Sequence, residues 1–300
     1  KCLDYDNEDY QSLYNLIFCY ENIGMIDESI GELSSVLEQR PYSKIAWHQL
    51  GKIYNKQGKF KESISAFDFA IISDDQFVSA YTEKAKVLEK VKRYNEALEN
   101  YRLSIELSEP NSFTYHRIAR CYIKINNKKL FLEFIKKSVR EEPGNEKAWV
   151  FLIKYYLKNN NFRQAKYLAS KALINNHNSI KILSLNAIIF KEIGDTKQAV
   201  KFYNQILEFK ENLSWKIWKR LLKCLIDNKE WTELLRTSLK AKKHYPNKAF
   251  LDFIISGCLL KNGKLNEAIY FYQSGKKTSQ VPDKLIKYFP EFDENKTLLV

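Results

Sequence analysis

The chain has 300 residues, of which 45% are hydrophobic and 28% are charged, and 49 lysine and arginine residues against 36 aspartate and glutamate residues give it a formal net charge of +13. No run of about 18 uncharged apolar residues occurs, so the sequence contains no segment that is expected to span a bilayer. It also contains no glycine-rich phosphate loop and no C-x-x-C or H-E-x-x-H motif, which argues against catalysis built on these motifs.

Within the N-terminal stretch, residues 1–9, the run from Cys2 to Asn7 resembles the end of a second helix followed by a turn between repeats. We therefore expect residues 1–9 to be the end of a preceding repeat. We also expect at least one further repeat to precede Lys1 in the full-length protein.

After these residues, a sequence motif recurs every 34 residues. In its clearest copy the marked positions are Trp47, Leu50, Gly51, Tyr54, Phe60, Phe67 and Ala70. One period later they are Tyr81, Ala85, Leu88, Tyr94, Ala97 and Tyr101, and the next copy has Tyr115, Ala119 and Tyr122. The first four marked positions share one face of a helix, and the last two lie on the stripe of a second helix. A fixed period with two helical stripes predicts a stack of helix-turn-helix units.

Glycine, proline and alanine mark fixed points of the repeat. Glycine stands between the two stripes, where a left-handed backbone conformation would end the first helix, at Gly24, Gly58, Gly194 and Gly263. Proline follows the second stripe at Pro41, Pro143 and Pro246. Small residues recur at one site of the first helix (Gly51, Ala85, Ala119, Ala187) and at one site of the second (Ala97, Ala165, Ala199, Ala268). We expect the helices to approach closely at these sites.

With these residues the sequence resembles the tetratricopeptide repeat family, whose motif has the same order of aromatic, Leu-Gly, small and proline positions. The resemblance implies an all-α, right-handed superhelical solenoid of about eight helix-turn-helix repeats. We expect eight repeats within residues 10–282, starting near 10, 44, 78, 112, 146, 180, 215 and 249. Residues 283–300 lack the motif and are expected to form a C-terminal cap and tail, in which Leu285, Ile286, Tyr288 and Phe289 cover the last repeat before Pro290 stops the helix.

The fourth and seventh repeats depart from the motif, because Phe131 and Leu234 replace small residues. The seventh repeat also gathers large aromatic residues at Trp215, Trp218, Trp231 and Tyr245. These rings either fill the gap that the lost small residue leaves, which we favour, or form a second contact patch, since exposed tryptophan is typical of interface hot spots.

The cysteines Cys19, Cys121, Cys224 and Cys258 fall at the same point of the first helix in their repeats and are predicted to be small core residues. Because adjacent helices lie about 8–10 Å apart, cysteines in different repeats are too distant for a disulfide or a shared metal. Reduced thiols of this kind favour a cytoplasmic location.

Basic residues also follow the repeat. Lys52, Lys86, Arg120 and Lys154 are one repeat apart, and each is followed four residues later by a lysine, at Lys56, Lys90, Lys124 and Lys158. Pairs at this spacing share one helix face. The family resemblance implies that the first helices line a concave groove, and that His48 and His116, one helical turn before Lys52 and Arg120, join it. We therefore predict that these ten residues form a basic groove for an acidic peptide or protein surface.

Two alternatives stay open for these lysines. They could be solvated residues without a dedicated ligand, or the groove could bind nucleic acid, RNA in particular, through its phosphates. The second alternative is disfavoured because most aromatic residues occupy packing sites, which leaves few to stack on bases. Chaperone-binding relatives carry an asparagine where this chain has Lys52, Lys86 and Arg120, so a chaperone tail is not the expected partner.

Catalysis has little support in the sequence. His48, His116, His177 and His244 lie in different repeats, and no Cys-His or Ser-His-Asp arrangement can be assembled from the periodic positions. We predict a non-enzymatic interaction scaffold with no catalytic residue, cofactor, metal, small-molecule substrate or membrane insertion. The stretch 66–97 also resembles a group of tetratricopeptide proteins of Bacteroidetes without assigned activity, which implies a bacterial, cytoplasmic protein.

Overall fold

The computed structural model describes residues 10–109, 111–209 and 212–292, and these residues fold into α-helices, turns and one short 3-10 helix. The all-α fold class predicted from the sequence is therefore confirmed. None of the helices in this part of the chain has both the length and the apolar composition needed to cross a bilayer. The expected end of a preceding repeat at residues 1–9 and the tail at 293–300 lie outside the described residues.

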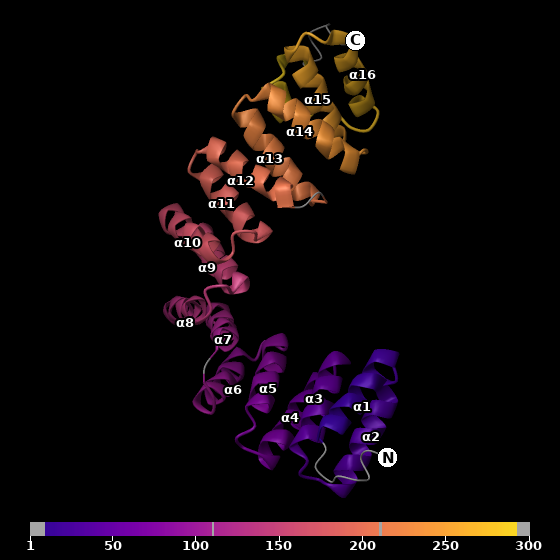
Figure 1. Cartoon of the computed structure of the whole chain (residues 1–300), viewed down its shortest axis with the longest axis vertical. Helices are drawn as coiled ribbons and strands as arrows, with labels where there is room; N and C mark the ends of the chain where they lie inside the picture. Colours follow the sequence, from indigo (N-terminus) through magenta and orange to yellow (C-terminus); the bar gives the residue numbers. More distant parts are fainter. Residues whose placement is uncertain (1–9, 110, 210–211, 293–300) are drawn as a thin grey trace. The chain divides into compact units, whose positions relative to one another are not determined.

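Consecutive helices pack side by side as antiparallel pairs, each joined by a short turn (Figure 1). The first helices of the pairs are α1 (Tyr10–Ile23), α3 (Lys44–Lys56), α5 (Val78–Lys90), α7 (Ser112–Lys124), α9 (Glu146–Lys158), α11 (Ile180–Glu192), α13 (Trp215–Asp227) and α15 (Ala249–Lys261). The second helices are α2 (Ile26–Gln39), α4 (Phe60–Ser73), α6 (Tyr94–Glu106), α8 (Lys128–Glu141), α10 (Phe162–Asn175), α12 (Thr196–Phe209), α14 (Trp231–His244) and α16 (Leu265–Lys276). Residues up to Ala148 form one compact unit, here called the N-terminal unit, and residues from Trp149 form the C-terminal unit.

The turn inside each pair is built the same way. Gly24, Gly58, Gly194 and Gly263 adopt positive φ angles of 80°, 77°, 86° and 72°, which confirms the role predicted for these glycines. In the other pairs Lys92, Asn126, Asn160 and Lys229 take the same conformation, with φ between 55° and 64°. The next residue then donates its N–H to a carbonyl five residues earlier, as Lys59 does to Tyr54 at 2.9 Å. The turn is thus fixed by backbone hydrogen bonds, and glycine lowers its strain without being required.

Small residues bring the helices of a pair together. The hydroxyl of Ser63 on α4 donates to the carbonyl of Gly51 on α3 at 2.7 Å. A Cβ atom on Gly51 would lie 2.8 Å from the ring of Phe67, so only glycine fits beneath this ring. Phe131 and Leu234, which depart from the motif, are fully buried and belong to the packed interior.

The aromatic residues around α13 pack against their neighbours in the C-terminal unit. Trp218 is buried, and Trp215 lies 5.6 Å from the ring of Tyr245. The ring of Trp231 lies 5.4 Å from that of Phe289. Trp218 is buried and the other three side chains are half-buried, so the structure agrees with the interpretation that they fill a gap in the core.

The cysteine prediction holds in three cases and is wrong in one. Cys121, Cys224 and Cys258 are buried, whereas Cys19 on α1 is exposed. The reason is positional, since α1 belongs to the first pair that the structure describes and no described helix pair precedes it to cover Cys19.

The C-terminal segment packs onto the last helix pair through α17 (Asp283–Ile286) and the 3-10 helix η1 (Pro290–Phe292). Leu285, Phe289 and Phe292 are buried in the core of the C-terminal unit. A Cβ atom on Gly257 of α15 would lie 2.5 Å from the Phe289 ring, so this ring sits directly on the helix backbone. The Lys261 ammonium group also pairs with the Glu291 carboxylate at 3.1 Å.

Candidate functional site

Eight of the ten predicted groove residues lie on first helices of the N-terminal unit, and six of these eight are lysine or arginine. These six basic residues occupy equivalent positions of α3, α5 and α7 and are here called the basic face: Lys52, Lys56, Lys86, Lys90, Arg120 and Lys124. Lys154 and Lys158 are exposed on α9 and fall in the C-terminal unit, so their membership of a shared groove stays a prediction.

One hydrogen bond and one shared electrostatic effect relate the basic residues of α3 and α5. The ammonium group of Lys90 donates to Asn55 Oδ1 at 2.6 Å, which joins the C-terminal turns of the two helices. One turn earlier, the charges of Lys52 and Lys86 both act on the imidazole of His48. Equivalent lysines of successive repeats are therefore neighbours on one surface.

Aromatic rings accompany these cations. The Lys52 ammonium group lies 6.0 Å from the centre of the Tyr14 ring. The ring of Phe113, at the start of α7, lies 4.9 Å from the Lys86 ammonium and 5.8 Å from the Arg117 guanidinium. Phe113 is 45% exposed, so the basic face carries an apolar ring that a partner could contact.

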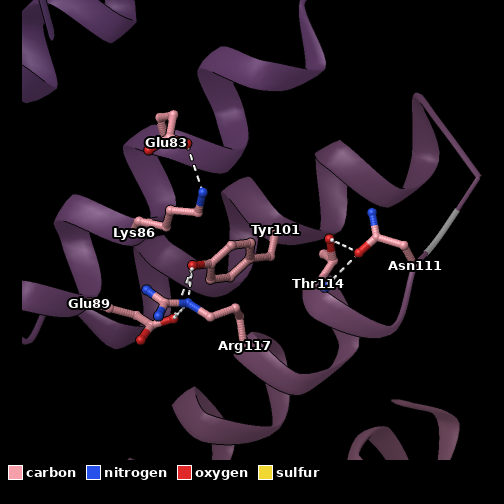
Figure 2. A network of polar contacts seen from close by, with 7 residues as sticks. All are labelled: Glu83, Lys86, Glu89, Tyr101, Asn111, Thr114 and Arg117. Carbon is pink, nitrogen blue, oxygen red and sulfur yellow. Dashed lines mark hydrogen bonds and ion pairs between the residues drawn. The ribbon is translucent and has the colours of Figure 1, made fainter. Parts of the chain in front are cut away.

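Acidic groups neutralise part of the positive charge. Lys86 pairs with Glu83 at 2.7 Å, and Arg117 pairs with Glu89 at 2.8 Å (Figure 2). Within the part of the chain that the structure describes, Lys52, Arg120 and Lys124 have no carboxylate at ion-pair distance. Together with Lys90, whose hydrogen-bond acceptor among the described residues is the neutral amide of Asn55, these three carry uncompensated positive charge.

A buried polar network supports the basic face from below. The Tyr101 hydroxyl donates a hydrogen bond to the Glu89 carboxylate at 3.0 Å, and Arg117 Nε donates a hydrogen bond to the same hydroxyl at 3.0 Å (Figure 2). The side chain of Glu89 is 8% exposed and that of Arg117 is 18% exposed. Burial and the Glu89 charge raise the pKa of Tyr101, which keeps the phenol protonated as a donor. The network joins α5, α6 and α7 and fixes the orientation of the face.

One of the two histidines differs from the predicted arrangement. His48 is only 5% exposed, with Phe67 and Phe77 rings at 5.7 and 5.2 Å, so it lies beneath the basic face and does not line it. Burial, with the Lys52 charge, lowers the pKa of His48 to about 4. His116 is half-buried, and burial together with Arg120 also lowers its pKa to about 4. Both imidazoles are neutral at pH 7 and add no positive charge to the face.

Three residues of this surface were not identified from the sequence. Glu83 and Arg117 stand three residues before Lys86 and Arg120, a spacing that places them on the same helix face and would have revealed them. Phe113 occupies a position that the repeat motif does not mark, so its exposure follows only from the structure.

Within each unit the fold is a run of helical hairpins packed through small residues, which defines a helical-repeat protein. The tetratricopeptide repeat family model matches residues 45–71 and 78–111, the second and third hairpins. These two hairpins therefore match tetratricopeptide repeats, as the sequence resemblance implied. Proteins of this family are protein-interaction scaffolds.

Similar proteins agree with this assignment. The tetratricopeptide repeat-containing protein trd-1 of Caenorhabditis elegans is 24% identical over 193 residues, which are 64% of this chain and 24% of that protein. The chain thus spans about a quarter of the length of the curated relative it matches. Among solved structures, the C-terminal part of a tetratricopeptide repeat protein from Cytophaga hutchinsonii has a TM-score of 0.65 at 12% identity, covering 80% of this chain and 98% of that one. The type IV pilus biogenesis factor PilW has a TM-score of 0.57 at 16% identity, with 73% and 100% of the two chains covered. At these identities the solved structures show the fold alone.

Proposed function

We propose that the chain is a non-enzymatic protein-interaction scaffold whose basic face binds an acidic segment of a protein partner. The observation that carries the proposal is the repetition of cations on successive first helices, since Lys52, Lys86 and Arg120 occupy equivalent positions of α3, α5 and α7, and Lys90 of α5 donates to Asn55 of α3. A row of cations along stacked helices attracts an extended anion and aligns it along the row.

The composition of the face favours a peptide over a nucleic acid. Lys52, Arg120 and Lys124 lack ionic partners among the described residues and can pair with the carboxylates of an acidic segment. The exposed ring of Phe113 between Lys86 and Arg117 can contact an apolar side chain of the same segment. Acidic Glu83 and buried Glu89 interrupt the positive charge, which disfavours a continuous phosphate backbone.

The proposal is tested with a fluorescein-labelled peptide of alternating glutamate and leucine and with a labelled single-stranded RNA. Binding to each is measured by fluorescence anisotropy over a range of salt concentrations. The first variant changes Lys52, Lys90, Arg120 and Lys124 to glutamine. The control variant changes exposed basic residues on the second helices of the same unit, with the same loss of charge: Lys61, Lys129, Lys136 and Arg140 to glutamine.

We expect the peptide to bind the unchanged chain and the control variant alike, and to lose at least about tenfold in affinity with the basic-face variant. Equal losses in the two variants would reduce the interaction to net charge and overturn the assignment of the face. Tighter binding of the RNA than of the peptide, lost in the basic-face variant, would support the nucleic-acid alternative instead.

A further inference from the structure

A second basic site lies within the C-terminal unit and is separate from the basic face. It is a pocket of about 450 Å³ between the ends of α11, α13 and α15 and the C-terminal segment. Its lining residues are Lys191, Lys223, Ile226, Asp227, Phe250, Lys284, Leu285, Lys287 and Tyr288. Its volume is within the range of pockets that hold small molecules, about 300–1,000 Å³.

Positive charge dominates the polar part of this pocket. Four lysines line it, and its carboxylate, Asp227, accepts a hydrogen bond from the Tyr288 hydroxyl at 2.9 Å and lies 4.0 Å from Lys191. Lys223, Lys284 and Lys287 have no carboxylate at ion-pair distance within the described ranges 10–109, 111–209 and 212–292. Burial lowers the pKa of Lys223, and the ammonium groups of Lys219, Lys191 and Lys284 lower it further. An anion bound among these lysines would relieve this repulsion.

The rest of the lining is apolar. Ile226 and Leu285 are buried, and Phe250 offers a half-buried ring that also packs against Trp215 at 6.1 Å. A ligand that fits this pocket therefore has a charged end and an apolar or aromatic end.

The wall that carries Lys284 and Lys287 is held in place by packing and not by a ligand. Phe289 is seated on Gly257 with no exposed surface, and Tyr288 is tied to Asp227 of α13. The lysines are consequently preorganised, which lowers the conformational cost of binding.

We propose that this pocket binds a small organic phosphate, with the phosphate among Lys223, Lys284 and Lys287 and the apolar part against Phe250. The cations of the lining are lysines, whose ammonium groups act as point charges, and three of them around one point match the roughly two negative charges of a phosphate better than the single charge of a carboxylate. No asparagine or glutamine is among the described lining residues, so the side-chain amides that would hold a peptide backbone are missing. These features favour a compact dianion over an acidic peptide.

The test uses 1-naphthyl phosphate, a fluorescent aryl phosphate, with inorganic phosphate and 1-naphthol as the charged and apolar halves alone. Affinities are measured by fluorescence titration and calorimetry at pH 7.5. The variants are Lys223→Gln and the double variant Lys284→Gln/Lys287→Gln, and Lys240→Gln on α14 is the control because Lys240 is exposed and does not line the pocket. Circular dichroism establishes that each variant keeps its helical content.

We expect naphthyl phosphate to bind more tightly than either half, and each lysine removed from the pocket to weaken its binding by about tenfold, with Lys240→Gln unchanged. Equal affinities in the pocket and control variants would overturn the proposal. The proposal would also be overturned if the pocket failed to bind naphthyl phosphate but bound a glutamate-leucine peptide, and if the double variant lost this peptide binding. Because no residue of the basic face is changed, either outcome leaves the proposed function in the N-terminal unit untouched.

Discussion

Replacing Glu89 with methionine removes the acceptor that Arg117 and Tyr101 share beneath the basic face. The guanidinium group of Arg117 is then left mostly buried without its counterion, since only 18% of this side chain is exposed. Removing one partner of a buried ion pair costs about 3–5 kcal/mol. Because Arg117 keeps some contact with water and with the Tyr101 hydroxyl, we expect a loss of about 2–3 kcal/mol.

The double variant Glu89→Met/Arg117→Met removes both charges and replaces them with apolar side chains. Replacing both partners of a buried ion pair with apolar side chains changes the free energy of unfolding little. We therefore expect a cost of about 1–2 kcal/mol, which reflects mainly lost packing. If Arg117→Met alone costs about 2–3 kcal/mol, the cycle gives an interaction energy of about 2 kcal/mol or more.

Stability is measured by urea unfolding followed by circular dichroism. Amide hydrogen exchange of α5 and α7 is added, because repeat arrays can unfold locally. The control is Glu133→Met, which breaks an exposed pair with Lys137 at 41% and 47% exposure and is expected to cost less than about 0.5 kcal/mol. Strict additivity of the two single variants, or an equal effect in the control, would refute the reasoning.

Three further outcomes are expected. Gly51→Ala should lower the stability of the N-terminal unit by about 1–3 kcal/mol in thermal unfolding because its Cβ meets the Phe67 ring, whereas Gly31→Ala, with open space around its Cβ, should stabilise the chain. His48 has a pKa of about 4 in the folded chain against an ordinary value of 6.5, so the unfolded chain binds the proton more readily and stability falls as the pH drops from 6.5 towards 4. This loss of stability reaches about 3 kcal/mol at its limit. It should be smaller in a His48→Phe variant when the stabilities at pH 7 and pH 4.5 are compared by urea unfolding. An unchanged loss would show that other groups cause it. Lys92→Gly should raise the melting temperature because Lys92 has φ of 64°, and a decrease would mean that the side chain contributes more than the backbone strain costs.

The turns inside the hairpins illustrate how far local sequence predicts structure. Four of them carry glycine and were recognised from it, whereas Lys92, Asn126, Asn160 and Lys229 adopt the same left-handed conformation without a glycine. Periodicity places the two helical stripes, and the chain must turn between them whatever residue stands there. Backbone hydrogen bonds across the turn then impose the conformation.

The candidate site was only partly predictable. The repeat spacing identified Lys52, Lys86 and Arg120 as equivalent positions, since residues one repeat apart occupy the same place in successive hairpins. It could not reveal that Lys86 is paired with Glu83 or that a neutral His48 lies below the surface. Side-chain pairing and burial depend on the rotamers and volumes of residues from several helices, which a repeat motif does not encode.

By itself, the sequence determined the all-α hairpin fold of this chain, because the spacing of apolar and small residues within each helix is a local property that does not depend on how the repeats are arranged. Tertiary structure alone decided the charges that remain uncompensated on the basic face, and it assembled the pocket from Lys191, Lys223 and Lys284. These lysines are separated by 32 and 61 residues and share no motif, so only the packing of the C-terminal segment onto α13 and α15 brings them together.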